Sequence, residues 1–391
     1  MEQAKQVQAR VRRPGRVKEK IRMFSVRAGI DLPFLTIVLV LLTIGLIMLF
    51  SASYAYALAY YGNSYHFFKN QLIWAILGIA AMILCSYFDY HKFHKLAVPI
   101  LILSYMLLVL VLFMPARNGA HRWISIGGAG FQPSEITKFA IVVSFAHFMS
   151  ISYQKMNRFS TGILPYLVIF GSSAALLIKE PHLSCTVIIF CLTCFMMFIG
   201  GVKARWFVIA FAVIGILAYI ALFTDLIPYA SDRIGVWRDP FGYADRDASH
   251  QTRQSLYAIG SGGFLGLGIG NSRQKYLYLP EPQNDFIFAV ICEELGFVGA
   301  MIIILLFALL VWRGMVIALR APDKFGTLLC MGLTVQVGLQ AVLNIAVVSN
   351  TVPNTGISLP FFSYGGSSLV MLMAQMGIVL SVSRSARMEK S

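Results

Sequence analysis

The stretch IGSGGFLGLGIGNSRQKYLYLPEPQNDFIFAVICEELG, residues 259–296, joins a glycine-rich segment, expected to be a flexible loop, to a long apolar helix. Two cations, Arg273 and Lys275, come shortly before one acid, Asp285, which stands where the apolar helix begins. An acid at the boundary between water and membrane costs free energy, so it usually has a functional reason. The stretch therefore predicts a functional site at one end of a membrane-spanning helix.

The composition around this stretch is that of a membrane protein. Of 391 residues, 58% are hydrophobic and 13% are charged, whereas soluble globular domains carry about 25% charged residues. Apolar runs of roughly 20 residues recur along the chain, and each is long enough to cross a hydrocarbon core of about 30 Å. The expected fold class is all-α: a polytopic membrane helix bundle with about ten transmembrane helices.

The pattern of basic residues supports ten spans with both termini in the cytosol. The segments that this topology places inside hold 21 of the 32 Lys and Arg residues, as the positive-inside rule requires. We expect a basic cytosolic tail, residues 1–28, and a ten-span membrane domain, residues 29–391, with one large external loop at about 225–285. The spans are expected at residues 32–53, 70–88, 96–114, 134–152, 162–179, 183–200, 206–224, 286–312, 326–348 and 367–383.

Other classes of protein fit the sequence poorly. The net charge is +15, and nine of the 32 Lys and Arg residues lie in the tail, so we expect contact with the membrane and no nucleic-acid binding. The six cysteines lie in or beside apolar runs, which indicates no disulfide framework and no structural zinc site. The glycines at 260–270 lack the GxGxxG spacing and the preceding strand of a dinucleotide site.

Three acids in or beside the eighth expected span are candidates for chemistry. Asp285 could be a general base that takes a proton from a hydroxyl group, and partial burial by Phe286 and Phe288 would raise its pKa to suit that role. Its alternative role is to cap the helix. Glu293 and Glu294 lie further inside the same helix, where at least one should face a cavity or a cation; their alternative role is helix pairing.

A second group of polar residues is expected at the same level of the membrane. Glu135 and Lys138 begin the fourth span with i, i+3 spacing, which favours a structural pair but would also place Lys138 beside a lipid phosphate. Glu180 follows the fifth span, where Pro181 breaks the helix. Arg122 lies in the loop before Glu135.

Four stretches together resemble one family. They are Arg122-Trp123 followed by QPSEITK, RQSLYAIGSGG at 253–263, SRQKYLYLPEPQNDFIFAVICEELG at 272–296, and SLPFFSYGGSSL at 358–369. The chain is similar to the SEDS family (shape, elongation, division, sporulation), which includes RodA, FtsW and SpoVE. The basic tail, FSASY at 50–54 and the wording DFIFAVICEELG look closer to FtsW or SpoVE than to RodA.

The resemblance implies an activity and a cellular setting. It implies a peptidoglycan glycosyltransferase in the bacterial cytoplasmic membrane that polymerises lipid II, an undecaprenyl-pyrophosphate-linked disaccharide peptide, at the outer face. It implies a class B penicillin-binding protein as partner, together with other divisome or cell-wall proteins. A divalent cation, Mg²⁺ or Mn²⁺, could assist, although the sequence shows no dedicated ligand set. The alternative function is a lipid II flippase, which would need no base on an external loop.

The resemblance also assigns roles to residues. The family's essential acid falls on Asp285, its acid and lysine of the QPSE motif fall on Glu135 and Lys138, and its cations before LPE fall on Arg273 and Lys275. Arg122, Arg253 and Glu180 complete the expected substrate-binding set. One departure is His182, which stands where the family commonly has an acid, so either that acid's role is lost or Glu180 takes it over.

Overall fold

The chain is almost entirely helical wherever its structure is described. Its one small sheet in that part is an antiparallel hairpin of β1 (Ile124–Ile126) and β2 (Ala129–Phe131). The expected all-α fold class is therefore confirmed, whereas the expected basic tail lies outside the described residues. The computed structural model describes residues 29–115, 122–126, 129–210, 212, 228–243 and 245–386.

Within that part of the chain, eight helices are long and apolar enough to cross a membrane. A shorter apolar helix, α6 (Leu183–Ile199), has 17 residues and matches the sixth expected span. The seventh, at 206–224, falls mostly outside the described residues, so the count of ten stays a prediction. The eight are α1 (Leu32–Tyr61), α2 (His66–Tyr87), α3 (His91–Val111), α4 (Pro133–Ser152) extended to Lys155, α5 (Leu164–Lys179) together with the turn from Phe159 that precedes it, α10 (Ile287–Leu319), α11 (Lys324–Val348) and α12 (Gly366–Arg384).

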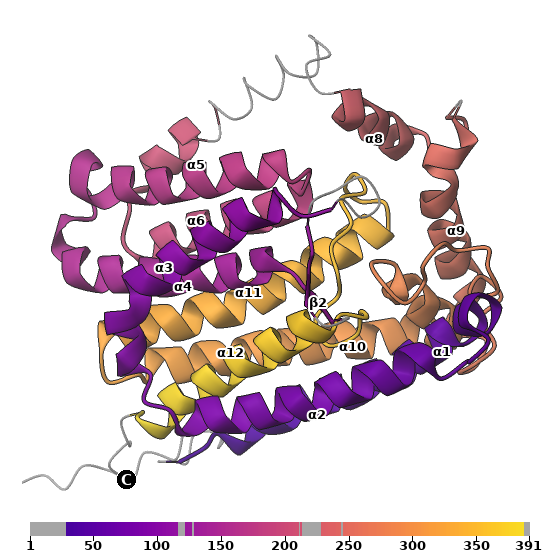
Figure 1. The fold of residues 1–391 in the computed structure, drawn as a ribbon, viewed down its shortest axis with the longest axis horizontal. Helices are drawn as coiled ribbons and strands as arrows, with labels where there is room; N and C mark the ends of the chain where they lie inside the picture. Colours follow the sequence, from indigo (N-terminus) through magenta and orange to yellow (C-terminus); the bar gives the residue numbers. More distant parts are fainter. Residues whose placement is uncertain are drawn as a thin grey trace, which may run out of the picture.

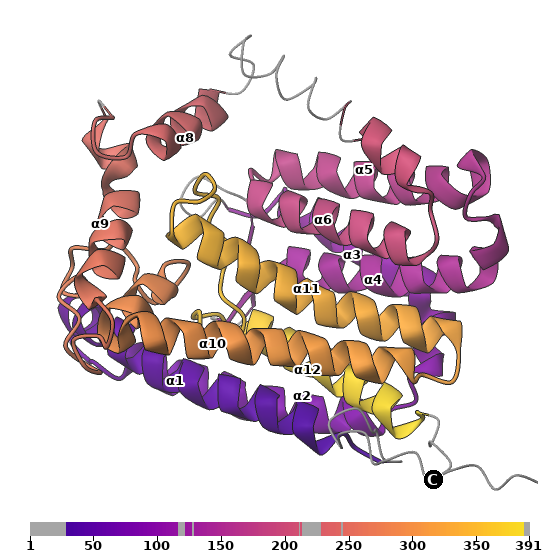
Figure 2. The same cartoon turned by 180° about the vertical axis from the view of Figure 1, so that it is seen from behind.

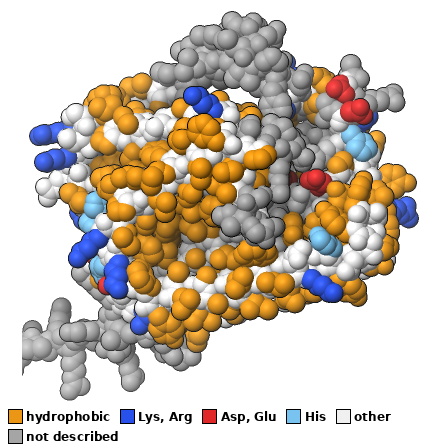
Figure 3. All heavy atoms as spheres, in the orientation of Figure 1, with side chains coloured by type: hydrophobic (Ala, Val, Ile, Leu, Met, Phe, Trp, Pro, Cys, Tyr) orange, Lys and Arg blue, Asp and Glu red, His pale blue; other side chains and the backbone are white. Residues whose placement is uncertain are grey.

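The helices form one bundle. In Figures 1 and 2, α1 and α2 lie along one edge, α5 and α6 lie along the opposite edge, and α10 and α11 run between them. Hydrophobic side chains make up much of the described surface seen in Figure 3, which suits a surface in contact with lipid. The two turns η2 (Tyr153–Lys155) and η3 (Phe159–Ile163) join α4 to α5.

Glycines let α2 and α12 approach closely. A Cβ atom on Gly377 of α12 would lie 2.3 Å from the carbonyl oxygen of Met82, and one on Gly78 of α2 would lie 3.0 Å from the side chain of Met373. Because lipid tails are as apolar as the helices, such small residues and the packing they permit hold membrane helices together.

Asp31 starts α1 and ties it to α10. Its carboxylate accepts a hydrogen bond from the backbone N–H of Phe34 at 3.0 Å, which satisfies one of the free N–H groups at a helix start. The same carboxylate forms a buried ion pair with Arg313, with 2.7 Å between Nη2 and Oδ2. Two helices that are far apart in the sequence are thus fixed to each other.

Helix α10 is broken at Gly296, whose φ of 65° and ψ of −168° are not helical. In an unbroken helix, the N–H groups of Phe297 and Val298 would donate to the carbonyls of Glu293 and Glu294. The break separates these four groups. Each must find another partner, because an unpaired backbone group at membrane depth is costly.

An inserted loop, residues 263–268, supplies all four partners. Its Gly266 packs so closely on the break that a Cβ atom there would lie 2.2 Å from the carbonyl oxygen of Glu294. The first part of α10, residues 287–295, is a short helical rod, and at the break its backbone hydrogen-bonds to the loop instead of to the rest of α10. The bonds are Phe297 N to Gly263 O (3.0 Å), Val298 N to Phe264 O (3.2 Å), Leu267 N to Glu293 O (3.0 Å) and Gly268 N to Glu294 O (2.9 Å).

The expected large loop at about 225–285 contains two helices, α8 (Pro228–Arg238) and α9 (Arg246–Gly262). The end of α9 includes Ile259, so the expectation that a flexible loop begins there is wrong; the non-helical backbone begins at Gly263. From Gly263 to Phe286 the chain winds through turns to the start of α10 and carries Asp285 there.

Candidate functional site

Asp285 lies in the turn that leads into α10 and is partly buried. The helix begins at Ile287, its N-cap residue is Phe286, and no side chain caps it. The alternative role of Asp285 as the helix cap is therefore wrong. Its carboxylate is not used to satisfy the backbone N–H groups of α10.

The surroundings of Asp285 change its acidity. Burial raises the pKa of this carboxyl from 3.8 to about 6, and the negative charge of Glu281 adds to the rise. The positive charges of Arg122 and Arg233 oppose it by favouring the ionised form. Burial is thus the main cause of the raised pKa, as the sequence predicts. A carboxyl group with this pKa is ionised near neutral pH and is still basic enough to accept a proton.

The two arginines whose charges act on Asp285 are far apart in the sequence. Arg122 stands just before β1, and its guanidinium donates to the backbone carbonyls of Glu180 and Pro181. Arg233 belongs to α8 and donates to the carbonyl of Asn354. Main-chain oxygens thus hold two cations near the carboxylate.

The expected pair of Glu135 and Lys138 is present, with 2.9 Å between Nζ and Oε1. Lys138 is buried at the start of α4 and also donates to Oε1 of Gln340 in α11 at 3.1 Å. Gln340 in turn donates to the carbonyl and the hydroxyl of Ser358, both at 3.1 Å. A chain of polar contacts therefore runs from α4 through α11 to the loop before α12.

Glu135 also lines a pocket between these elements. The pocket lies beside the turn that carries Asp285, because its lining residue Ser363 donates a hydrogen bond to the carbonyl of Asn284 at 2.8 Å. Its walls carry an unusual number of amides and hydroxyls for the interior of a membrane bundle, which is typical of a place that receives polar groups. The lining residues are Glu135, Gln336, Gln340, Ser358, Leu359, Pro360, Phe361, Ser363, Ser368, Leu369, Leu372 and Gln375.

Glu180 and His182 lie buried between α5 and α6. Burial raises the pKa of Glu180 to about 8, against the effect of Arg122, and lowers the pKa of His182 to about 3. Both side chains are therefore neutral at pH 7. Glu180 is 1% exposed, so its carboxyl lies in the interior, and its replacement of the missing acid stays a prediction.

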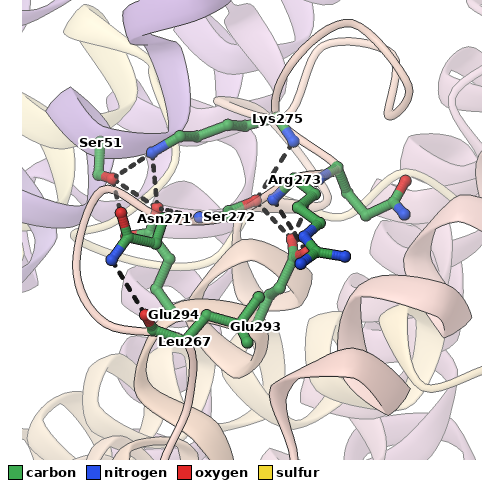
Figure 4. A network of polar contacts seen from close by, with 9 residues as sticks. Ser51, Leu267, Asn271, Ser272, Arg273, Lys275, Glu293 and Glu294 are labelled. Atoms are coloured by element: carbon green, nitrogen blue, oxygen red, sulfur yellow. Dashed lines mark hydrogen bonds and ion pairs between the residues drawn. The ribbon is translucent and has the colours of Figure 1, made fainter.

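Lys275 lies elsewhere than the sequence predicted. Its ammonium is buried against Glu294, with 2.8 Å between Nζ and Oε1, and it also donates to Oγ of Ser51 at 3.1 Å (Figure 4). The expectation that Glu293 or Glu294 faces a cation is confirmed for Glu294. Lys275 thus neutralises an acid inside the bundle, and this place gives it no path to a phosphate.

Glu293 organises the segment that follows the inserted loop. Its carboxylate accepts hydrogen bonds from the backbone N–H of Arg273 at 3.0 Å and from the hydroxyl of Ser272 (Figure 4). It also accepts bonds from the backbone N–H of Gln274 and the hydroxyl of Ser261, both at 3.3 Å. The side chain of Arg273 is exposed. Arg253 is half-buried on α9. Among the described residues, the charges that shift the pKa of Asp285 belong to Glu281, Arg122 and Arg233.

Two residues that the sequence did not suggest act on Asp285, one by its charge and one by a hydrogen bond. Arg233 lies in a polar segment without a recognisable motif, and only the path of α8 brings it to Asp285. Asn344 is one of three amides in an apolar helix, with Gln336 and Gln340, which was a signal that could have been used, because a buried polar side chain in a membrane span needs a reason. Its amide donates to the carbonyl of Asp285 at 2.7 Å.

The expected divalent cation finds no ready-made protein site. Among the residues that the structure describes, no group of three or more His, Cys, Asp or Glu side chains could hold a metal ion. Asp285 and Glu281 could each contribute a carboxylate oxygen, which suits a hard cation. In the described part of the chain, protein ligands alone do not form a complete set.

Comparison with known proteins gives a consistent result. Residues 32–388 match the family described as "Cell cycle protein", FtsW, RodA and SpoVE. The chain is 40% identical over 372 residues to stage V sporulation protein E of Bacillus subtilis, covering 93% of this chain and 100% of that protein. It is 36% identical over 365 residues to the probable peptidoglycan glycosyltransferase FtsW of Geobacter sp. (strain M18), covering 92% and 98%.

Solved structures have the same fold. A chain in a structure that describes how a peptidoglycan synthase complex coordinates polymerization and crosslinking superposes with a TM-score of 0.78 at 25% identity, over 92% of this chain and 98% of that one. The rod shape determining protein RodA of Thermus thermophilus superposes with a TM-score of 0.67 at 23% identity, over 92% and 98%.

Proposed function

Because the chain belongs to the FtsW, RodA and SpoVE family of cell cycle proteins, we propose that Asp285 is the general base of its reaction. The chain is a peptidoglycan glycosyltransferase of cell division or sporulation. The observation that carries the proposal is the carboxylate of Asp285, which is partly buried, carries a raised pKa and has two arginine charges beside it.

The proposed substrate is lipid II. The 4-hydroxyl of the acceptor sugar attacks the anomeric carbon of the donor, whose bond to the diphosphate oxygen breaks. The hydroxyl proton passes to Asp285 as the new bond forms, and the undecaprenyl diphosphate leaves with the bonding electrons. Direct displacement turns the α-linked donor into a β-linked glycan. A positioned base of this kind contributes about 10²–10⁴-fold in rate.

The charge of the leaving diphosphate needs cations, and Arg122 and Arg233 are better placed for this than Lys275. Their charges act on Asp285 directly, and the main-chain carbonyls that they contact keep the guanidinium groups in place. Arginine suits the task because its fork of donors matches phosphate oxygens. A Mg²⁺ or Mn²⁺ ion that is held mainly by the diphosphate would add to the same effect.

The pocket beside Asn284 is the proposed place for polar groups of the substrate headgroup. Glu135 reaches it directly, and Lys138 supports it through Gln340. The buried pair of Glu135 and Lys138 keeps the wall of the pocket in one arrangement. This assignment gives both residues of the QPSE motif a role beside the base.

We propose a class B penicillin-binding protein as the partner and the outer face of the bacterial cytoplasmic membrane as the place of the reaction. The polymerization and crosslinking attributed to the similar synthase complex support a partner that crosslinks. The placement of basic residues supports termini in the cytosol. The names of the relatives favour the enzyme over the alternative of a lipid II flippase.

The test uses the full-length chain, purified with its penicillin-binding partner and given labelled lipid II. Asp285→Ala should abolish glycan polymerisation, while the matched variant Asp239→Ala, in the turn after α8, should retain it. An Asp285→Ala enzyme that polymerises at the wild-type rate would contradict the proposal and would favour a transport function.

A further inference from the structure

Asn344 lies one turn before the end of α11 and is completely buried. Its amide nitrogen donates to the backbone carbonyl of Asp285 at 2.7 Å and to that of Ile357 at 2.5 Å. An amide NH₂ group has two hydrogens, so these two bonds use both. One side chain thus joins α11, the turn before α10 and the loop before α12.

The loop before α12 holds the other residues of the same turn. The hydroxyl of Ser363 donates to the carbonyl of Asn284, and the backbone N–H of Tyr364 donates to the carbonyl of Gln283, both at 2.8 Å. Asn344 makes the corresponding bond at Asp285 itself. The three consecutive carbonyls of residues 283–285 are therefore each anchored.

The bond from Asn344 to Ile357 bears on the carboxylate as well. The preceding residue, Gly356, packs against it so closely that a Cβ atom there would lie 3.0 Å from Oδ2 of Asp285. Because Asn344 holds the carbonyls on both sides of this contact, it sets how far the loop and the carboxylate stand apart. A shift of either segment would move the carboxylate.

The buried amide of Asn344 costs stability, which indicates that its two donated hydrogen bonds have a function. Oδ1 of Asn344 is buried and has no hydrogen-bond partner among the described residues. An unpaired buried oxygen costs stability, which an apolar side chain of similar size would avoid. The two donated bonds are what asparagine offers here and leucine does not.

We propose that Asn344 is a positioning residue for glycosyl transfer, which fixes the carboxylate of Asp285 at the acceptor hydroxyl by holding the carbonyls of Asp285 and Ile357. The inference rests on the proposed role of Asp285 as the base. Asn344 acts through Asp285 and does not touch the substrate, so it affects the rate of the chemical step and leaves lipid II binding unchanged.

The experiment compares Asn344→Leu and Asn344→Asp with Asn350→Asp in the full-length chain purified with its partner. Asn350 is a matched control, because its amide also donates to a backbone carbonyl, that of Trp237, at 3.2 Å. A displacement of about 1 Å costs roughly 10²-fold in rate. We expect kcat for lipid II polymerisation to fall by about that factor in both Asn344 variants, with KM and the binding of fluorescent lipid II changed less than about threefold.

The pH dependence provides a readout that a general loss of structure would not produce. A carboxylate released toward water loses the desolvation that raises its pKa, so the acid limb of kcat/KM should move to lower pH in Asn344→Leu. Asp285→Ala is measured in parallel. An Asn344→Leu enzyme with wild-type kcat, beside an inactive Asp285→Ala enzyme, would overturn the inference alone, and so would loss of lipid II binding in both Asn344 variants. An active Asp285→Ala enzyme would instead overturn the proposed function.

Discussion

At the scale of single residues, the site depends on a conflict between burial and charge. Asp285 is pushed toward its protonated form by burial and by Glu281, and toward its ionised form by Arg122 and Arg233. The balance leaves a carboxyl with a pKa of about 6, which is the range of a useful general base. The arginines have a second use, because the positive charge that tunes the base is also the charge that a departing diphosphate needs.

Replacement of Arg233 by Ala should change both the pKa of Asp285 and the stabilisation of the departing diphosphate. We expect kcat/KM for lipid II to fall about 10- to 100-fold, which corresponds to the loss of one charge-assisted hydrogen bond. The acid limb of the pH profile should move to higher pH, because the cation that lowers the pKa of Asp285 is gone. Arg238→Ala, an exposed residue on the same helix, is the control. A lower kcat/KM with an unshifted acid limb of the pH profile would mean that Arg233 does not act on Asp285.

The buried carboxylate should also cost stability. A folded-state pKa of about 6 against 3.8 means that ionisation opposes folding; the penalty is absent below pH 3.8 and complete above pH 6. Asp285→Asn should therefore raise the free energy of unfolding at pH 8 by up to about 3 kcal/mol and leave it unchanged at pH 3.5. Thermal unfolding in detergent at the two pH values measures this. An equal gain in stability at pH 8 and at pH 3.5 would show that the stabilisation by Asp285→Asn is not electrostatic.

At the scale of elements, the broken helix α10 explains how a base is carried on a membrane span. The rod at residues 287–295 holds Asp285 at its first end and the Glu293 and Glu294 carbonyls at the other. Asn344 anchors the first end, and the inserted loop, residues 263–268, anchors the second. The catalytic turn is thereby fixed from two sides by segments outside its own helix.

Gly266 provides a test of the inserted loop. Both Gly266 and Gly270 have positive φ angles, 81° and 87°, but a Cβ atom on Gly270 would meet nothing within 4 Å, whereas one on Gly266 would meet the backbone of the helix break. Gly266→Ala should therefore destabilise the protein by about 1–3 kcal/mol more than Gly270→Ala and lower polymerisation. Thermal unfolding of the two variants decides this, and equal losses would show that the close packing does not matter.

At the scale of the whole molecule, the sequence predicts the bundle much better than the site. Hydropathy and charge predict the helices from α1 to α6 and from α10 to α12, because each span must satisfy its own backbone in lipid. Motifs identify Asp285 and the pair of Glu135 and Lys138. They do not separate Arg273 and Lys275, because neighbours in sequence face different partners once the chain folds. The roles of Arg233 and Asn344 depend on contacts between distant segments, which no local pattern encodes.

The orientation in the membrane is a prediction for the whole chain. In intact cells, a membrane-impermeant thiol reagent should label a single cysteine placed at Ser231. The same reagent should not label a single cysteine placed at Gln6. The reason is that the basic residues gather in the segments assigned to the cytosol. Labelling of the tail from outside would reverse the topology and would remove Asp285 from the outer face.

The central claim is that Asp285 accepts the proton of the attacking hydroxyl, and the pH dependence of kcat/KM for lipid II polymerisation tests it most directly. The wild-type profile should bend at about pH 6 and fall tenfold per pH unit below it, because only the ionised carboxylate acts as a base. Asp285→Asn should be slower by about 10²–10⁴-fold and should lack this acid limb. A limb near pH 6 that persists in Asp285→Asn, or a wild-type profile that stays flat down to pH 4.5, would contradict the assignment.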